Sequence, residues 1–531
     1  MKYPIGIQTF EKIIEGNYLY FDKTAMIYDL VNNGNIYFLS RPRRFGKSLL
    51  LSTIDAYFRG KKELFKGLAI ESLEMEWEEY PVLRIDFNSN KFEDPGVLES
   101  VLETFVANAE REYGRDDLAE TIGDRFRAVI ANAHKKTGKR VVVLVDEYDK
   151  PLLDVMNVPG YTISPTGERI TMEERNRSVL KGFYSTFKAA DADLQFVFLT
   201  GVTKFSQVSV FSGFNQPLDI SMDARYDAIC GITKEELFEK LDTQIAEMAE
   251  QNEVSVEEMK YYLKMRYDGY HFSSRMTDMF NPFSILNAFC KMELNDYWFQ
   301  TGSPTYLVRL MADNDVTIDE YIGKWMPAST FMDFKANAQT PLPMLYQSGY
   351  LTIKDYKRLM MRPVYKLDFP NDEVKAGFVP LIAANYFKKN NGTDIWVEEV
   401  ADAMETGDLE KLKNLFVSFF ASIPYSLREK GTEGEKEKHF QYTMFLVLNM
   451  ITSFHVSAEK QQSEGRVDCI AETPEHVYIF EFKRDGSADE ALKQIEDKGY
   501  ARPYAADKRT VHKVGVNFSS QTGTIDGFVF S

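Results

Sequence analysis

The chain has few cysteines and histidines. Its 531 residues include three cysteines, Cys230, Cys290 and Cys469, which lie far apart and show no Cys-x-x-Cys spacing. That spacing argues against a disulfide framework or a zinc site and fits a reducing compartment. The six histidines form no ligand cluster in the sequence.

Long apolar runs and excess positive charge are also missing. No run approaches membrane-spanning length, and the N-terminus lacks the apolar core of a signal peptide, so we expect a cytoplasmic protein with no membrane partner. The net charge of −17 excludes a surface that attracts nucleic acid everywhere. Any nucleic-acid contact must come from a local basic groove, or through metal ions that bridge carboxylates to phosphates.

The length and the apolar pattern predict several domains, the first of them α/β. A chain of 531 residues is too long for one hydrophobic core. Runs rich in Val, Ile, Leu and Phe alternate with amphipathic segments long enough for crossover helices, which predicts a parallel sheet buried on both faces. The strand-like runs are residues 36–39, 82–87, 141–145 and 194–199.

From about Thr233 the pattern becomes mainly helical. Helices are predicted over 235–252 and 256–265, with strand-like stretches at 349–353 and 364–367, which favours a helical or winged-helix-like lid. A helical connector at 394–418 and a charged stretch at 428–438 precede a final α/β domain. We therefore expect an α/β domain at 1–235, a helical or winged-helix-like lid at 236–390, a helical connector at 391–430 and a second α/β domain at 431–531.

A phosphate-binding loop follows the first predicted strand. The sequence Arg41-Pro42-Arg43-Arg44-Phe45-Gly46-Lys47-Ser48 joins that strand to a predicted helix beginning near Leu49. In such a loop the backbone approaches phosphate oxygens at the glycine, the lysine reaches the β and γ phosphates, and the serine hydroxyl ligates Mg²⁺. We therefore expect ATP contacts from residues 43–49 and a metal contact from Ser48.

The loop alone is an incomplete Walker A motif, and a second motif supports it. Arg41 replaces the usual first glycine, Pro42 removes a backbone donor, and a bare Gly-Lys-Ser/Thr occurs by chance in roughly one chain in four of this length. However, the strand at 141–145 ends in Asp146 and Glu147, as a Walker B strand does. Asp146 is expected to hold Mg²⁺ and Glu147 to polarise the attacking water.

The strand at 194–199 ends in Thr200. A polar residue at this position can sense the γ-phosphate between the other two strand ends, although an ordinary strand-end turn explains the sequence equally well.

Two acids and a lysine gather near the C-terminus. Asp468 lies on one predicted strand of a hairpin, and Glu481 and Lys483 lie on the next. Residues two apart on a strand share a face, so pairing of the strands brings all three together. Two carboxylates can bind divalent ions that stabilise charge on a phosphodiester, and a lysine can position the attacking water.

The same residues also have a structural interpretation. Glu-x-Lys is common on half-exposed strands as a salt bridge, and the preceding Gly465-Arg466-Val467-Asp468 is what favours a metal site. Gln494 and Lys498 share one face of a following helix and can contact phosphates or simply face solvent. Glu437 and Glu459 are further candidate acids, and surface charge explains them as well.

With these motifs the chain resembles the bacterial AAA-ATPase-like proteins that carry a C-terminal PD-(D/E)XK nuclease domain. The resemblance covers nearly the whole length, and its most specific phrase is the loop at 40–48. Other matching phrases are 4–10, 20–24, 145–151, 267–272, Tyr297-Trp298 with Thr301-Gly302, 349–352, 465–468, 481–483, and Gln494-Ile495 with Lys498 and Tyr500. The resemblance implies ATP binding despite Arg41, a restriction-endonuclease-like last domain, and a metal site at Asp468, Glu481 and Lys483.

These patterns together lead to three functional hypotheses. The first is an ATPase coupled to a Mg²⁺-dependent endo- or exonuclease, with DNA favoured over RNA, in which Glu147, Asp468, Glu481, Lys483 and Gln494 act in catalysis. The second is an ATP-switched module that binds nucleic acid or protein without cutting. The third is a structural relic with neither activity. The sequence leaves open whether the chain forms a homo-oligomer.

Overall fold

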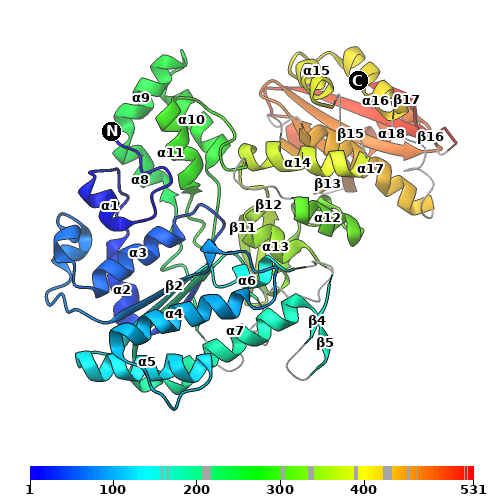
Figure 1. The fold of residues 1–531 in the computed structure, drawn as a ribbon. Coiled ribbons are helices and arrows are strands. Elements are labelled where there is room, and N and C mark those ends of the chain that lie inside the picture. The colour runs from blue at the N-terminus through cyan, green and yellow to red at the C-terminus, as the bar shows by residue number, and fades with distance from the viewer. Residues whose placement is uncertain are drawn as a thin grey trace. The chain divides into compact units, whose positions relative to one another are not determined.

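The computed structural model describes most of the 531 residues (Figure 1). The described residues are 1–156, 160–163, 167–205, 217–299, 305–332, 340–387, 393–422, 433–450, 455–462, 465–519, 521–522 and 524–531. The chain divides into two compact units, one of residues 1–298 and 325–371, the other of residues 299–324 and 372–531. The four-part division expected from sequence stays a prediction.

A five-stranded sheet forms the base of the first unit. Its order is β2-β3-β6-β1-β7, and every pair is parallel. The four strands predicted from apolar runs are all present, and they are completely or mostly buried, as strands covered on both faces must be. The strands are β1 (Ile36–Ser40), β2 (Val82–Asp86), β3 (Val141–Asp146), β6 (Leu194–Gly201) and β7 (Leu218–Asp219).

Helices cover both faces of this sheet. The connection from β1 to β2 crosses the sheet in one direction, and those from β2 to β3 and β3 to β6 return, so right-handed crossovers place α3 on one face and α4, α5 and α7 on the other (Figure 1). The helices of this part are α1 (Phe10–Glu15), α2 (Thr24–Asn33), α3 (Lys47–Phe58), α4 (Val97–Tyr113), α5 (Ile122–Thr137), α6 (Lys150–Leu153) and α7 (Met172–Ala189), and a small ribbon joins β4 (Thr162–Ile163) to β5 (Arg169–Ile170).

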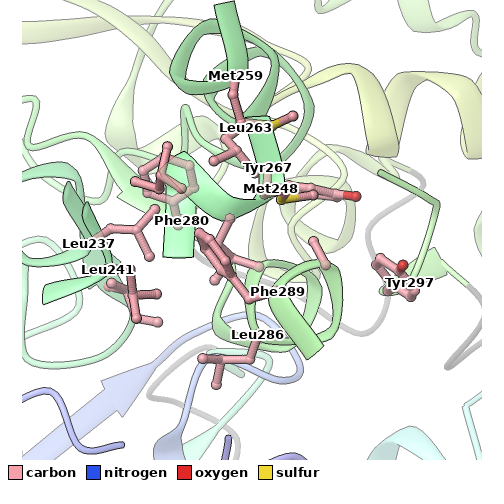
Figure 2. Close-up of a cluster of buried hydrophobic side chains, with 14 of the residues drawn as sticks. Leu237, Leu241, Met248, Met259, Leu263, Tyr267, Phe280, Leu286, Phe289 and Tyr297 are labelled. Atoms are coloured by element: carbon pink, nitrogen blue, oxygen red, sulfur yellow. The ribbon is translucent and has the colours of Figure 1, made fainter. Parts of the chain in front are cut away.

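A second core in this unit is helical (Figure 2). The segment expected as one helix at 235–252 is two helices, because the chain turns at Leu241, which is buried in this core. Tyr3 and Ile5 from the N-terminus pack against the same cluster. The elements are β8 (Ile232–Thr233), α8 (Lys234–Lys240), α9 (Asp242–Gln251), α10 (Val256–Tyr267), β9 (Met279–Phe280) and α11 (Pro282–Lys291).

The first unit ends in a short helix and a long hairpin. Helix α13 (Leu342–Gln347) leads into β11 (Thr352–Leu359), which pairs antiparallel with β12 (Arg362–Asp368). A third strand, β10 (Trp325–Pro327), pairs with β12. The strand-like stretches expected at 349–353 and 364–367 therefore mark a real hairpin, although its strands extend further than the sequence pattern indicated.

The second unit contains a five-stranded mixed sheet. Its order is β13-β14-β15-β16-β17, in which only β15 and β16 run parallel. Its strands are β13 (His455–Gln462), β14 (Gly465–Glu472), β15 (His476–Arg484), β16 (Thr510–Ser519) and β17 (Thr524–Phe530), and its helices are α12 (Thr305–Asp313), α14 (Asp372–Phe387), α15 (Thr393–Glu405), α16 (Leu409–Ser422), α17 (Glu433–Met450) and α18 (Ala488–Asp497). The expected hairpin is confirmed, and the connector expected at 394–418 is two helices, α15 and α16.

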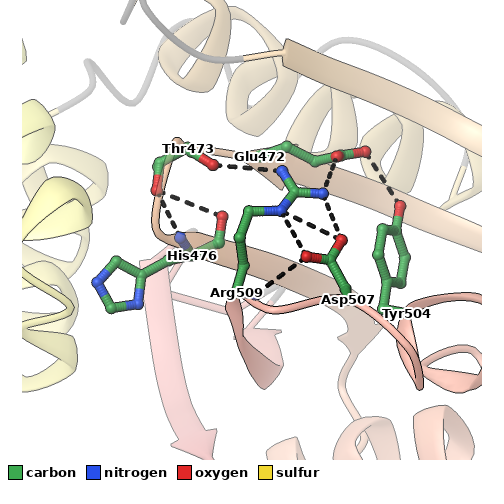
Figure 3. A network of polar contacts seen from close by, with 6 residues as sticks. All are labelled: Glu472, Thr473, His476, Tyr504, Asp507 and Arg509. Atoms are coloured by element: carbon green, nitrogen blue, oxygen red, sulfur yellow. Dashed lines mark hydrogen bonds and ion pairs between the residues drawn. The ribbon is translucent and has the colours of Figure 1, made fainter.

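A polar network fastens the β14–β15 turn (Figure 3). The Arg509 guanidinium lies 2.8 Å from Glu472 and 2.7 Å from Asp507, and it donates to the Thr473 carbonyl at 3.2 Å. The Tyr504 hydroxyl donates to Glu472 at 3.1 Å. These contacts hold the turn end of the hairpin, so its other end can carry the candidate site.

Candidate functional sites

Strand order brings the three candidate strand ends of the first unit together. Strand β6 lies between β1 and β3, so Thr200 is placed between the phosphate loop and the Asp146–Glu147 pair. The Thr200 hydroxyl donates to the Asp146 carboxylate at 2.8 Å, and both side chains are buried. The structure thus places Thr200 between the loop and the two acids, and its role as a γ-phosphate sensor stays a prediction.

The loop itself begins a helix. Gly46 is the N-cap of α3 and has a φ of 90°, a left-handed conformation that favours glycine. A Cβ built on Gly46 meets nothing within 4 Å, so the conformation, not crowding, requires the glycine. Arg44 also has a positive φ, 70°, and Arg43 and Arg44 are exposed. Ser48 and Leu49, the second and third residues of α3, are partly buried.

Lys47 folds back onto its own loop. Its ammonium is buried and donates to the carbonyl oxygens of Arg41 and Pro42 at 2.9 and 3.0 Å. Burial lowers the pKa of Lys47, while the nearby carboxylates of Glu147 and Asp146 raise it. A lysine held over loop carbonyls beside two acids is placed to exchange those contacts for phosphate oxygens.

Glu147 has an unusual environment. It has a φ of 51°, and burial raises the pKa of its carboxyl group. Lys47 lowers that pKa, and Asp146 and Asp86, at the end of β2, raise it further. A carboxylate with a raised pKa next to a phosphate loop suits polarisation of a water molecule.

Arg41 has a structural role that sequence reasoning did not find. Its buried guanidinium donates to the carbonyls of Ser40 at 2.9 Å and Ser221 at 2.8 Å, with longer contacts to those of Tyr226 and Asp227. The Phe272 ring lies 4.2 Å from it. Arg41 therefore ties the loop to the segment after β7, which accounts for the arginine at the usual glycine position.

Several further residues stabilise the loop. Phe45 was expected to contact ATP, whereas Asp149, Tyr270, Phe272 and Trp298 were named from the sequence only within family phrases. The Trp298 indole donates to the Arg43 carbonyl at 3.0 Å, and buried Phe45 packs against Tyr270 and Phe272. The Asp149 carboxylate accepts from the backbone N–H groups of Val202 and Thr203, joining the ends of β3 and β6. The only signal for the latter was the phrases themselves, 145–151, 267–272 and Tyr297-Trp298, since no spacing rule reveals such contacts.

The second unit gathers four predicted residues at one end of β15. The Asp468 carboxylate accepts from the Phe482 backbone N–H at 2.9 Å, so it reaches across from β14 to β15. Lys483 lies 4.0 Å from Glu481 and donates to Gln494 at 2.5 Å, and the Gln494 amide donates to Glu481. Lys498 is the C-cap of α18, and Tyr500 is buried in the adjacent core.

Glu481 is the best test of whether this group fits a metal ion. The residue is 2% exposed, and its Oε2 atom has no hydrogen-bond partner among the residues that the structure describes. Burial and the neighbouring Asp468 carboxylate raise the pKa of this carboxyl group and Lys483 lowers it, so that the pKa is raised overall to about 8. A buried carboxylate oxygen without a partner next to a second acid fits a divalent cation, because leaving it unpaired costs free energy.

Two acids, Asp468 and Glu481, lie at this site. Within the described ranges, no group of three or more His, Cys, Asp or Glu side chains has the geometry of a metal site. The side chains of Glu437 and Glu459 lie outside the described part of the chain, as do Thr301 and Gly302.

A close approach of α18 to the sheet places Gln494. Gly515 pairs with Glu481 on the neighbouring strand, and a Cβ on Gly515 would lie 2.2 Å from the Ala488 carbonyl oxygen and 2.7 Å from the Leu492 nitrogen. Only glycine permits this approach. A capping box between Ser487 and Glu490 begins the helix.

Comparison with known proteins supports this two-part architecture. Residues 4–211 match the family model described as a predicted AAA-ATPase, and residues 435–528 match that of the PD-(D/E)XK nuclease superfamily. A protein of Azotobacter chroococcum mcd 1, described as an uncharacterized protein in the vnfD 5′ region, is 36% identical over 535 residues, covering 99% of this chain and 98% of that protein.

Among solved structures, that of the Aeropyrum pernix ORC1 protein in complex with DNA matches at 10% identity and a TM-score of 0.26, covering 70% of this chain and 97% of that one. No helix in the described ranges has the length and apolar character needed to cross a membrane. From the two family matches and the full-length relative, we conclude that the chain belongs to the AAA-ATPase-like proteins with a C-terminal PD-(D/E)XK nuclease superfamily domain.

Proposed function

We propose that the protein is a nuclease acting on DNA phosphodiesters under the control of ATP. The observation that carries this proposal is a buried oxygen of Glu481, beside Asp468 and Lys483, that has no hydrogen-bond partner in the described part of the chain. Mg²⁺ held by Asp468 and Glu481 would supply charge stabilisation for the phosphodiester. Lys483 orients the attacking water, and Gln494 positions Lys483 and Glu481 through a hydrogen bond to each.

The ATPase half of the proposal rests on the loop and the two acids behind it. Lys47 binds the β and γ phosphates, residues 43–49 supply backbone donors, and Ser48 and Asp146 would hold Mg²⁺. Glu147 polarises water, and Thr200 links the γ-phosphate to Asp146. We place this chemistry in the cytoplasm.

The test is cleavage of linear and circular DNA, single- and double-stranded, with Mg²⁺ and with or without ATP. Asp468→Asn keeps the size of the side chain and removes its charge, so we expect cleavage to fall by roughly a hundredfold or more, while ATP hydrolysis is unchanged. Equal cleavage by the wild type and Asp468→Asn would falsify the nuclease half of the proposal.

A second candidate function is an ATP-switched binding module that does not cut. The described part of the site supplies two acids, and the chain carries a net charge of −17, which favours this alternative. Nucleotide affinity and assembly state of the wild type and Lys47→Ala discriminate between the two. ATP-dependent binding without cleavage on any of the DNA substrates supports the module.

A further inference from the structure

The β11–β12 hairpin is locally basic on an acidic protein. Between Thr352 and Asp368 the chain carries five basic and two acidic residues, against a net charge of −17 for the whole. The basic residues are Lys354, Lys357, Arg358, Arg362 and Lys366. A basic ribbon of this kind is the local feature that a nucleic-acid contact requires on such a chain.

The tip of the hairpin is apolar, exposed and conformationally strained. Residues 357–363 are all exposed, and Leu359, Met360 and Met361 have 58%, 92% and 82% of their surface accessible. Met360 and Met361 have φ values of 47° and 64°, where glycine or asparagine is usual in a two-residue turn. Two solvent-exposed methionines in a strained conformation cost stability, which indicates that the tip contacts another molecule.

The base of the hairpin is fixed. The Thr352 hydroxyl accepts from the His271 backbone N–H at 2.9 Å, and the His271 ring lies 2.8 Å from the Ile353 carbonyl. Lys354 donates to the carbonyls of Gly269 and Pro370 at 2.9 and 2.6 Å. The hairpin is therefore a rigid projection, and Lys354 belongs to its base.

The basic groups near the tip carry unneutralised charge. Lys357 lies over the Trp325 ring at 3.9 Å, and Arg358 donates to the Tyr356 hydroxyl at 3.0 Å. Among the ion pairs of the described residues, none involves Lys357, Arg358 or Arg362. These three cations lie around the two methionines and have no acidic partner within the described ranges.

We propose that this tip, residues 357–362, is a contact surface for double-stranded DNA. Lys357, Arg358 and Arg362 contact phosphates, and Met360 and Met361 enter a groove and pack against base edges. A two-stranded ribbon fits the major groove of B-form DNA, whereas the deep, narrow major groove of A-form RNA excludes it. The choice of DNA rests on the proposed function, but the contact requires no cleavage.

The experiment measures binding of a labelled DNA duplex to the full-length protein across a salt series, in EDTA so that no metal supports cleavage. The triple variant Lys357→Glu/Arg358→Glu/Arg362→Glu should lose at least about tenfold in affinity, and its slope of log affinity against log salt should fall by roughly 2 to 3. The control triple Lys12→Glu/Lys62→Glu/Lys66→Glu changes the charge equally at exposed positions of the same unit and should bind like the wild type.

A second variant separates the apolar tip from the charge. Met360→Ser/Met361→Ser keeps every basic group, so we expect affinity to fall severalfold with an unchanged salt slope. The proposal is overturned if the charge-reversed hairpin binds as the wild type does, if the control triple loses as much, or if duplex RNA is bound equally well through the same residues. It is also overturned if the hairpin variants alter self-association and leave DNA binding intact.

These outcomes are distinguishable from failure of the nuclease proposal. Hairpin-dependent binding in EDTA stands even if Mg²⁺ produces no cut. Conversely, if the wild type cleaves DNA and the hairpin variants bind DNA normally, the proposed DNA contact of the hairpin is wrong and the nuclease proposal stands.

Discussion

Arg41 stands where a phosphate loop usually has its first glycine. Its guanidinium donates to the backbone carbonyls of Ser40, directly before the loop, and Ser221, after β7. We predict that Arg41→Gly, which restores the usual motif, lowers the free energy of unfolding by roughly 2–4 kcal/mol, because buried carbonyls lose a charged donor. Thermal or urea unfolding measures this.

Arg44→Gly is the matched control for Arg41→Gly. Arg44 is exposed with a φ of 70°, so glycine relieves strain there, and stability should be unchanged or slightly higher. If Arg41→Gly unfolds at the same temperature as the wild type, the anchoring role of Arg41 is wrong.

Asp268 is a buried acid whose two carboxylate oxygens have no hydrogen-bond partner among the described residues. Burial raises the pKa of its carboxyl group to about 6, well above the usual value for aspartate. Between about pH 4 and about pH 6 the folded state therefore retains a proton that the unfolded state releases, and the contribution of Asp268 to the free energy of unfolding falls as pH rises over this range, then stays level.

We predict that Asp268→Asn removes this fall. The two proteins should have similar stability near pH 4, and above pH 6 the variant should gain relative to the wild type by on the order of 2–3 kcal/mol. Melting temperatures across this pH range measure the difference. A constant offset at every pH would show that Asp268 does not titrate there.

At the scale of elements, the packing of α18 against β16 decides where Gln494 lies. We predict that Gly515→Ala displaces α18, because the new Cβ meets backbone atoms of the helix. Cleavage should fall by about tenfold or more, and unfolding should be easier by roughly 1–3 kcal/mol.

ATP hydrolysis should be retained in Gly515→Ala, since the phosphate loop belongs to the other unit. Gly182→Ala in α7 is the control, because a Cβ there meets nothing within 4 Å and alanine favours a helix. Full cleavage by Gly515→Ala would mean that the position of Gln494 is not set by this contact.

Element by element, periodicity and strand composition predicted the sheet of the first unit well. Continuous apolar runs are typical of strands covered on both faces, so β1, β2, β3 and β6 were visible in the sequence. The break between α8 and α9 was not visible in the sequence, because the turn at Leu241 is caused by burial of that residue in a tertiary core.

At the scale of the whole molecule, nucleotide control of cleavage is the central prediction. Lys47→Ala should lose ATP hydrolysis, and cleavage by this variant should no longer respond to ATP. Measuring cleavage at increasing ATP concentration for the wild type and for Lys47→Ala tests this, with Asp468→Asn as the control that hydrolyses ATP and does not cut. An identical ATP response in the wild type and Lys47→Ala would show that the two activities are independent.

The two motifs, the α/β class and the candidate acids could be predicted without a structure, because they depend on local chemistry and on hydrophobic periodicity. Three features come from the folded chain instead: β6 lies between β1 and β3, Arg41 anchors the loop, and an oxygen of Glu481 has no partner among the described residues. Strand order, burial and hydrogen bonding are set by contacts between residues far apart in the chain, and no local pattern records them.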